Sequence, residues 1–178
     1  MKKINVQALV YASVLLAICI ASQVFKNLSV YITGPIINTC LVICVLASGF
    51  GYALALSIIT PITSFFITGS PIMSAIPLII PCVMAGNALL VLFVALFKNK
   101  FGKKAGLPIS MALGCIAKAA FMGVLISLII IPSLIPEIMA PKMTVFQTTF
   151  SVTQLITAVI GCVLAYIIWL PLKRFSNR

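Results

Sequence analysis

Long apolar runs alternate with short polar or basic breaks along almost the whole chain. About 20 consecutive apolar residues are needed to cross the hydrocarbon core of a bilayer as a helix. Breaks rich in glycine or proline, such as residues 48–51 and 69–71, end two of the runs. The pattern predicts one compact domain with six transmembrane helices, over residues 6–24, 33–47, 52–68, 78–97, 107–131 and 150–170.

The composition agrees with a membrane protein and excludes a soluble one. Hydrophobic residues make up 63% of the chain and charged residues 7%, against about 45–50% and 25% in soluble domains. Such a chain has too few polar side chains to cover a water-facing surface. We therefore expect an all-α integral membrane protein, a compact bundle of six transmembrane helices surrounded by the lipid bilayer.

The basic residues predict the orientation of the bundle. With six spans, both termini and the linker at residues 98–106 lie on one side, which holds Lys2, Lys3, Lys98, Lys100, Lys103, Lys104, Lys173, Arg174 and Arg178. The opposite flanks hold only Lys26 and Lys142. Because Lys and Arg accumulate in cytoplasmic flanks, we expect a multi-pass protein of the cell membrane with both termini in the cytoplasm. The first run is longer than a usual signal-peptide core, and we expect it to be a permanent helix.

The scarcity of ionisable side chains excludes most enzyme classes. The chain has no histidine, and its one acidic residue is Glu137, so it lacks the groups for a histidine-based triad, a carboxylate pair or a typical zinc site. All six cysteines fall inside apolar runs, where cysteine acts as a small hydrophobe. The net charge of +11 is explained by topology rather than by a nucleic-acid partner. We expect no catalytic residue, no bound metal and no cofactor.

Lys118 is the most informative residue of the predicted spans. It lies 14 positions after Lys104, or ~21 Å along a helix, which places it near the bilayer centre. A central lysine costs roughly 2.5–3.5 kcal/mol on insertion scales and normally faces a cavity or a partner. Two interpretations remain open. The ammonium is satisfied by backbone carbonyls and water, or it receives the carboxylate or carbonyl of a substrate.

The amide side chains also favour a polar pocket. Asn87 lies 11 residues before Lys98, ~16 Å from the cytoplasmic edge and so near mid-membrane. Gln23, Asn38 and Gln154 fall toward the external ends of their helices. Hydrogen bonds between helices account for any one amide, but the bias of the group toward the outer half indicates a pocket that opens outward.

Small residues at four-residue spacing allow close helix contacts. The first span holds two such pairs, Ala8 with Ala12 and Ala17 with Ala21, and the sixth span holds Gly161 with Ala165. Close approach of a second helix at these pairs serves either internal packing or the docking of a partner protein.

The chain resembles the substrate-binding S component of an energy-coupling factor (ECF) vitamin transporter. The resemblance covers the whole chain and rests on short motifs, which are Lys2-Lys3 before an Ala-x-x-x-Ala helix, Thr33-Gly34-Pro35-Ile36-Ile37-Asn38, Gly49-Phe50-Gly51, Pro61, Pro81 with Gly86-Asn87, and Lys118. It implies a six-helix bundle that captures a vitamin-like solute from outside. It also implies a membrane coupling subunit and two cytoplasmic ATPase subunits as partners. ATP hydrolysis on those chains agrees with the lack of a phosphate-binding loop motif in this one.

The resemblance also implies roles for individual residues. The Ala8 and Ala12 face would contact the coupling subunit. Ligand contacts would come from the first external loop and from the fourth to sixth helices, which here means Lys26 or Tyr31, Asn87, Lys118, Gln147 and Gln154. Asn38, which closes the quoted motif of the second helix, joins these candidates as one of the outer amides.

The near absence of acidic residues favours a neutral or anionic substrate, because a cation would need an acidic partner. The alternative function is that of a small structural or assembly protein. In that case its alanine faces would dock a larger membrane complex, and Lys118 and the amides would only hold the bundle together, without a ligand.

Overall fold

The computed structural model describes residues 5–25 and 29–176 of the chain. Over these residues the secondary structure is helical, and no strand occurs among them. The six long helices are α1 (Val6–Gln23), α2 (Val30–Ala47), α3 (Phe50–Thr68), α5 (Ile79–Phe97), α6 (Gly102–Met122) and α9 (Val152–Ser176). Each of the six predicted spans overlaps one of them.

The fifth span is longer than α6 itself. The π-helix η1 (Gly123–Ile130) and the short α7 (Ile131–Leu134) continue α6 without a break. In the part of the chain that the structure describes, six helical segments are long and apolar enough to cross a membrane. The prediction of an all-α protein with six such helices is therefore confirmed.

Local side-chain and backbone chemistry sets the helix ends. The side chains of Asn5 and Ser29 each accept a hydrogen bond from a backbone N–H of the first turn that follows, and so cap α1 and α2. Gly49, between α2 and α3, has φ 97°, and Gly69, at the end of α3, has φ 55°. These left-handed conformations favour glycine, which explains why the apolar pattern breaks at both positions.

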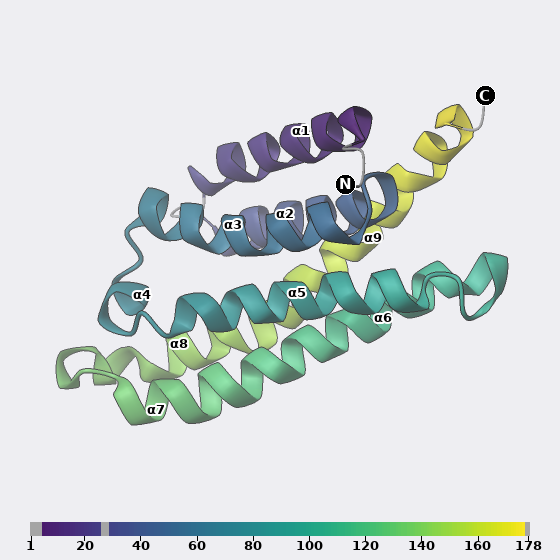
Figure 1. The fold of residues 1–178 in the computed structure, drawn as a ribbon. Helices are drawn as coiled ribbons and strands as arrows, with labels where there is room; N and C mark the ends of the chain where they lie inside the picture. Colours follow the sequence, from purple (N-terminus) through teal and green to yellow (C-terminus); the bar gives the residue numbers. More distant parts are fainter. Residues whose placement is uncertain (1–4, 26–28, 177–178) are drawn as a thin grey trace.

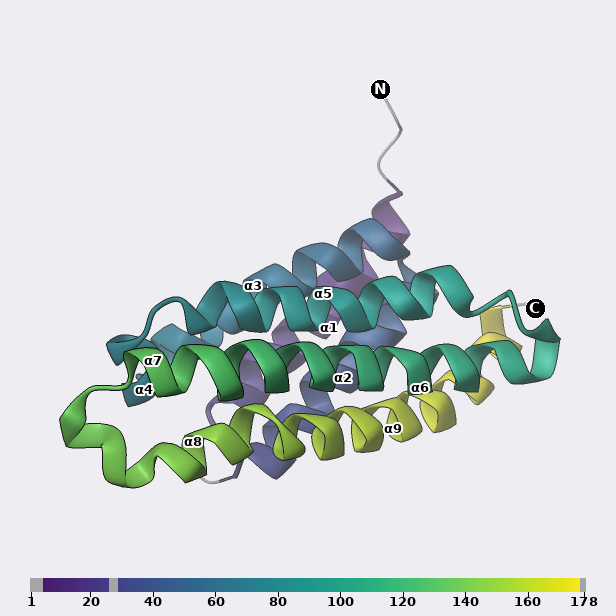
Figure 2. The same ribbon diagram turned by 90° about the horizontal axis from the view of Figure 1, so that it is seen from below.

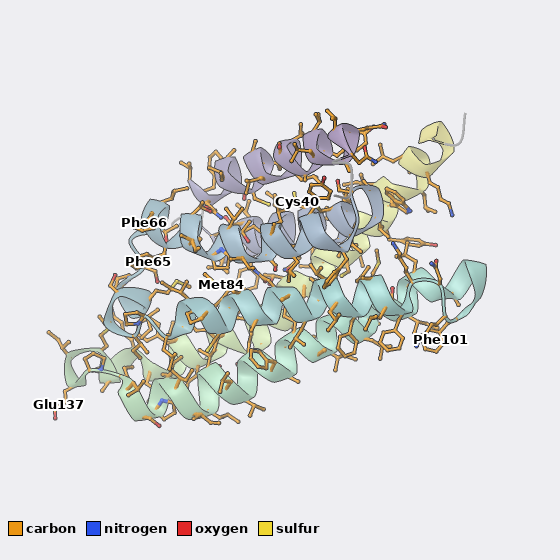
Figure 3. The ribbon with its side chains drawn as sticks, viewed as in Figure 1. Cys40, Phe65, Phe66, Met84, Phe101 and Glu137 are labelled. Carbon is orange, nitrogen blue, oxygen red and sulfur yellow. The ribbon has the colours of Figure 1, made fainter. Side chains whose placement is uncertain are left out.

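The helices run between two ends of the bundle (Figures 1 and 2). Helix α1 begins and α9 ends at the same end as the α5–α6 linker, which we call the linker end. The opposite end, the α8 end, holds α4 (Pro71–Ala75), the 3₁₀-helix η2 (Glu137–Lys142) and α8 (Met143–Phe150). Figure 3 shows Glu137 at the tip of the α8 end and Phe101 at the linker end.

Apolar side chains cover the outside of the bundle, and polar ones are buried inside it. Phe66 is 77% exposed, and α1 and α9 also expose rows of valine, leucine and isoleucine. By contrast, Gln23 and Lys118 are 0% and 2% exposed. This distribution is the reverse of that in a soluble protein, and together with the six long helices it supports a multi-pass membrane protein.

Glycines let α2 and α9 pack closely. A Cβ atom at Gly161 would lie 2.6 Å from the Cβ of Asn38 and 2.7 Å from the carbonyl oxygen of Pro35. A Cβ at Gly34 would lie 2.8 Å from two side-chain carbons of Thr157. Gly161 and Ala165 are both buried, so this small-residue pair of the sixth span serves internal packing.

The six cysteines are buried and free. Five of them belong to the main apolar core at the centre of the bundle, and Cys82 belongs to a second core beside η1 and α4. Cys115 and Cys162 bring α6 and α9 together, with 3.3 Å between their sulfur atoms. Their positions inside the spans are those that the apolar pattern predicts.

Candidate functional site

A cavity of about 360 Å³ lies inside the bundle near the α8 end. Its walls come from α2, α3 and α5, with single residues from α6 and α9, and α4 and α8 add residues at the α8 end. On α2 the lining extends from Val30 to Asn38, and on α3 from Thr68 to Thr60. Each stretch covers about two helical turns, so the cavity reaches ~12 Å into the bundle.

Lys118 and two amides form the polar cluster that lines this cavity. The Lys118 ammonium donates to Asn38 Oδ1 at 2.6 Å and to Asn87 Oδ1 at 2.8 Å. The three side chains come from α6, α2 and α5, and their residues are 1–4% exposed. The ammonium is therefore bound by amide oxygens from two other helices, and the network joins three helices.

The chemistry of an ammonium group fixes the orientation of both amides. Because Lys118 carries only donors, each asparagine must present its oxygen to it, and each Nδ2 group must point elsewhere. Among the described residues, no hydrogen bond uses Asn38 Nδ2 or Asn87 Nδ2, and the third Lys118 N–H also has no partner. The cluster therefore holds unused hydrogen-bond donors at a cavity wall.

The positive charge of Lys118 has no acidic partner. The sole carboxylate side chain of the sequence is that of Glu137, which is exposed on η2 at the outer tip of the α8 end (Figure 3). Amide dipoles stabilise the ammonium, but they do not neutralise it. The cavity is therefore a site of positive potential surrounded by apolar helices.

Close packing holds the cluster in place. At the α2–α9 crossing, Gly161 leaves no room for a side chain beside Asn38, whose Cβ would lie 2.6 Å from a Cβ at position 161. Gly86, next to Asn87, allows Met122 of α6 to approach closely. A Cβ at position 86 would lie 2.7 Å from the Met122 sulfur. Gly161 thus allows α2 to approach α9, and Gly86 allows α5 to approach α6, which carries Lys118. A larger residue at either position would displace a helix that holds one of the amides.

The rest of the cavity wall combines apolar side chains with hydroxyl groups. Ile37, Val83, Phe146 and Phe150 are among the apolar residues that line it. Its hydroxyls are partly used within the helices, since Thr60 Oγ1 donates to the Leu56 carbonyl oxygen at 2.9 Å. Such hydroxyls retain acceptor capacity, so the cavity can hold a body that is mainly apolar and has a few polar groups.

The structure brings four of the predicted ligand residues together. Lys118, Asn87, Asn38 and Gln154 all line the cavity. Gln154 Nε2 donates to the Thr149 carbonyl oxygen at 3.3 Å, so its Oε1 is left to accept a bond.

Two other predicted residues lie elsewhere, and one lies outside the described residues. Tyr31 lines a neighbouring groove that shares Val30, Val145 and Thr149 with the cavity. Its hydroxyl is 3.5 Å from Thr153 Oγ1. Gln147 is not among the residues that line the cavity, and Lys26 falls in the part of the chain that is not described.

Gln147 instead joins α8 to the π-helix η1 by hydrogen bonds. Its Nε2 donates to the Ser127 carbonyl oxygen at 2.8 Å, and Ser127 Oγ donates to the Gln147 carbonyl oxygen at 2.8 Å. The Ser127 carbonyl needs this donor because the amide of residue 132, its partner in a π-helix, belongs to proline. The N–H of Ile131 is already bonded to the Ile126 carbonyl. The pair holds α8 beside the cavity that it lines.

The predicted docking residues face the inside of the bundle. Ala8 and Ala12 are 6% and 7% exposed, and α1 packs against α2 and α3. The second small-residue pair of this helix, Ala17 and Ala21, is exposed instead. A partner helix would reach Ala8 and Ala12 only if α1 moved away from its neighbours, so docking there stays a prediction.

Sequence reasoning missed the cavity residues of the two short helices. Met73 from α4 and Phe146 from α8 line the cavity, but their segments lie in the predicted external loops.

Among the described residues, no group of three or more metal-ligating side chains exists. Comparison with protein-family models, curated proteins and solved structures found no match to this chain.

Proposed function

We propose that this chain is the substrate-binding membrane subunit of an ECF-type transporter. In this role it captures a small vitamin-like solute, neutral or anionic, from outside the cell for ATP-driven uptake. The observation that supports the proposal most strongly is the cavity of about 360 Å³ with Lys118, Asn38 and Asn87 in its wall. Its volume is within the range of roughly 300–1,000 Å³ found for small-molecule sites, which combine apolar walls with a few placed polar groups.

The unused donors favour ligand binding over a purely structural network. A buried polar network that only joins helices is stabilising when every member is satisfied. Here Lys118 and both amides keep donors that no described residue uses. A lysine within the membrane is also costly, and a ligand that accepts these bonds would offset that cost.

The proposal places the linker end in the cytoplasm and the α8 end outside. The α5–α6 linker, which holds Lys98 and Lys100, lies at the linker end, and so do the last turns of α9, which hold Lys173 (Figure 1). The excess of Lys and Arg in cytoplasmic flanks supports this orientation. In this orientation the cavity lies toward the external side. The N- and C-termini are then both cytoplasmic.

Labelling of single cysteines tests this orientation. On a background in which all six native cysteines are replaced, a membrane-impermeant thiol reagent applied to intact cells should label a cysteine at position 142. Cysteines at positions 100 and 173 should react only after the cells are opened. Labelling at position 100 in intact cells would reverse the proposed orientation.

The proposal also includes partners, namely a membrane coupling subunit and two cytoplasmic ATPase subunits. Purification of the tagged chain from its native membrane in mild detergent tests them. We expect an ATPase pair and a second membrane protein to copurify, and solute uptake by the complex to depend on ATP. Recovery of a larger complex without ATPases, and of a chain without any bound small molecule, would favour the assembly-protein alternative.

A further inference from the structure

We infer that the solute carries one carboxylate group, bound by the Lys118 ammonium and by the Nδ2 groups of Asn38 and Asn87. This inference rests on the proposed function, since it names the chemical class of the solute that the cavity accepts. The argument uses the charge of the cavity, the donors left unused in its wall and the nature of its remaining surface.

Charge balance favours a monoanion. Among the described residues that line the cavity, Lys118 is the one cationic residue and none is acidic. A bound anion of charge −1 would neutralise the site, whereas a cation would add to a positive charge already inside the membrane. A phosphate group, at −1.5 to −2 near neutral pH, would leave excess negative charge.

The number of unused donors fits a carboxylate. In the described part of the chain, Lys118 has one N–H without a partner beyond its bonds to the two asparagine oxygens at 2.6 and 2.8 Å. Each asparagine adds an Nδ2 group, which the ammonium forces away from itself. A carboxylate has two oxygens with about four lone-pair sites and can accept from all three groups, and such charge-assisted bonds are the strong ones. A single neutral carbonyl offers only two lone pairs.

The remaining lining describes the rest of the solute. Between the polar cluster and the α8 end the wall includes Ile37, Val83, Phe146 and Phe150, which suit an apolar or aromatic body. The cavity volume of about 360 Å³ lies at the lower end of the range for small-molecule sites. The inferred solute is therefore a compact organic monocarboxylic acid with its carboxylate directed at Lys118.

The substitution Asn87→Asp tests the inference with almost no change of shape. It places a permanent carboxylate 2.8 Å from Lys118, where it neutralises the ammonium and repels an incoming anion. The matched control is Asn99→Asp, which makes the same change on an exposed residue of the α5–α6 linker. Small molecules released by heat from each purified full-length protein are identified by mass spectrometry, and methyl esterification counts their carboxyl groups.

We expect wild type and Asn99→Asp to release the same compound with one esterifiable group. The amount of this compound that Asn87→Asp retains should be lower by a factor of roughly ten or more. Its unfolding temperature should be equal or higher, because the new carboxylate forms an ion pair with Lys118 inside the bundle. Release of a compound without a carboxyl group, or full retention by Asn87→Asp, would overturn the inference and leave the proposed function intact. If the wild-type protein released no compound above the level found with an unrelated membrane protein, both the inference and the proposed function would be overturned.

Discussion

The Lys118→Met protein should lose its solute while its bundle stays folded. Methionine keeps most of the length and apolar volume of lysine but removes the ammonium that donates to Asn38 and Asn87. Loss of a hydrogen bond to a charged group costs roughly 1.5–3 kcal/mol, which corresponds to an affinity roughly 10–150-fold lower. The affinity is measured on the purified protein by titration with the solute that copurifies with wild type.

The stability of Lys118→Met should be unchanged or higher. Removal of the buried charge relieves a cost of roughly 2.5–3.5 kcal/mol, while the two asparagine oxygens lose their donor, at roughly 1–3 kcal/mol each when no substitute is present. Because both asparagines line a cavity of about 360 Å³, water can reach their oxygens and reduce that loss. The unfolding temperature in detergent measures the net effect on stability. Lys100→Met is the control, because it makes the same substitution at an exposed lysine.

The opposite result would assign Lys118 a structural role. In that case Lys118→Met would unfold at a much lower temperature, and the fraction that remained folded would bind the solute as wild type does. The experiment thus separates the two interpretations of Lys118 by opposite changes in two measured quantities.

Gly161→Ala should destabilise the bundle by forcing α2 and α9 apart. The added Cβ would lie 2.6 Å from the Cβ of Asn38 and 2.7 Å from a backbone oxygen of Pro35. Neither atom belongs to the far end of a flexible side chain, so α2 and α9 must separate. Overpacking of this kind typically costs about 1–3 kcal/mol.

Displacement of α2 should also weaken binding, because Asn38 moves away from Lys118. The control is Gly51→Ala, on the exposed side of α3, where a Cβ would meet nothing within 4 Å. That protein should be as stable as wild type or slightly more so, since alanine favours a helix by roughly 1 kcal/mol over glycine. Equal unfolding temperatures for Gly161→Ala and wild type would refute the close α2–α9 contact.

The six long helices could be predicted because lipid imposes a strong pattern on sequence. Every spanning segment must be long, apolar and helical, and the runs that follow the breaks at residues 48–51 and 69–71 show this directly. Lys118 could be singled out for the same reason, since a lysine in the middle of such a run is costly. Each of these predictions depends on a single stretch of chain.

The convergence of the cluster could not be predicted in the same way. Lys118 and Asn38 are 80 positions apart, and whether they meet depends on the rotation and depth of α2 and α6 in the bundle. Those are set by contacts such as that between Gly161 and Asn38. The sequence placed Asn38 among the outer amides without indicating a lysine as its partner.

Short helices were also beyond the reach of the apolar pattern. Helices α4 and α8 have 5 and 8 residues, which is too short for a periodic signal of the kind that reveals an 11–18-residue helix. The role of Gln147 could not be predicted either. Pro132 leaves the Ser127 carbonyl without a backbone donor only in the π-helical register of η1, whereas in an α-helix that carbonyl would bind the N–H of Ile131.

Native mass spectrometry of the intact protein, released gently from detergent, tests the central claim that this cavity binds a solute. We predict that the wild-type chain carries one small organic molecule in a one-to-one ratio, and that Lys118→Met gives the mass of the chain alone. A wild-type chain without any added mass, after purification from cells grown in rich medium, would contradict the claim.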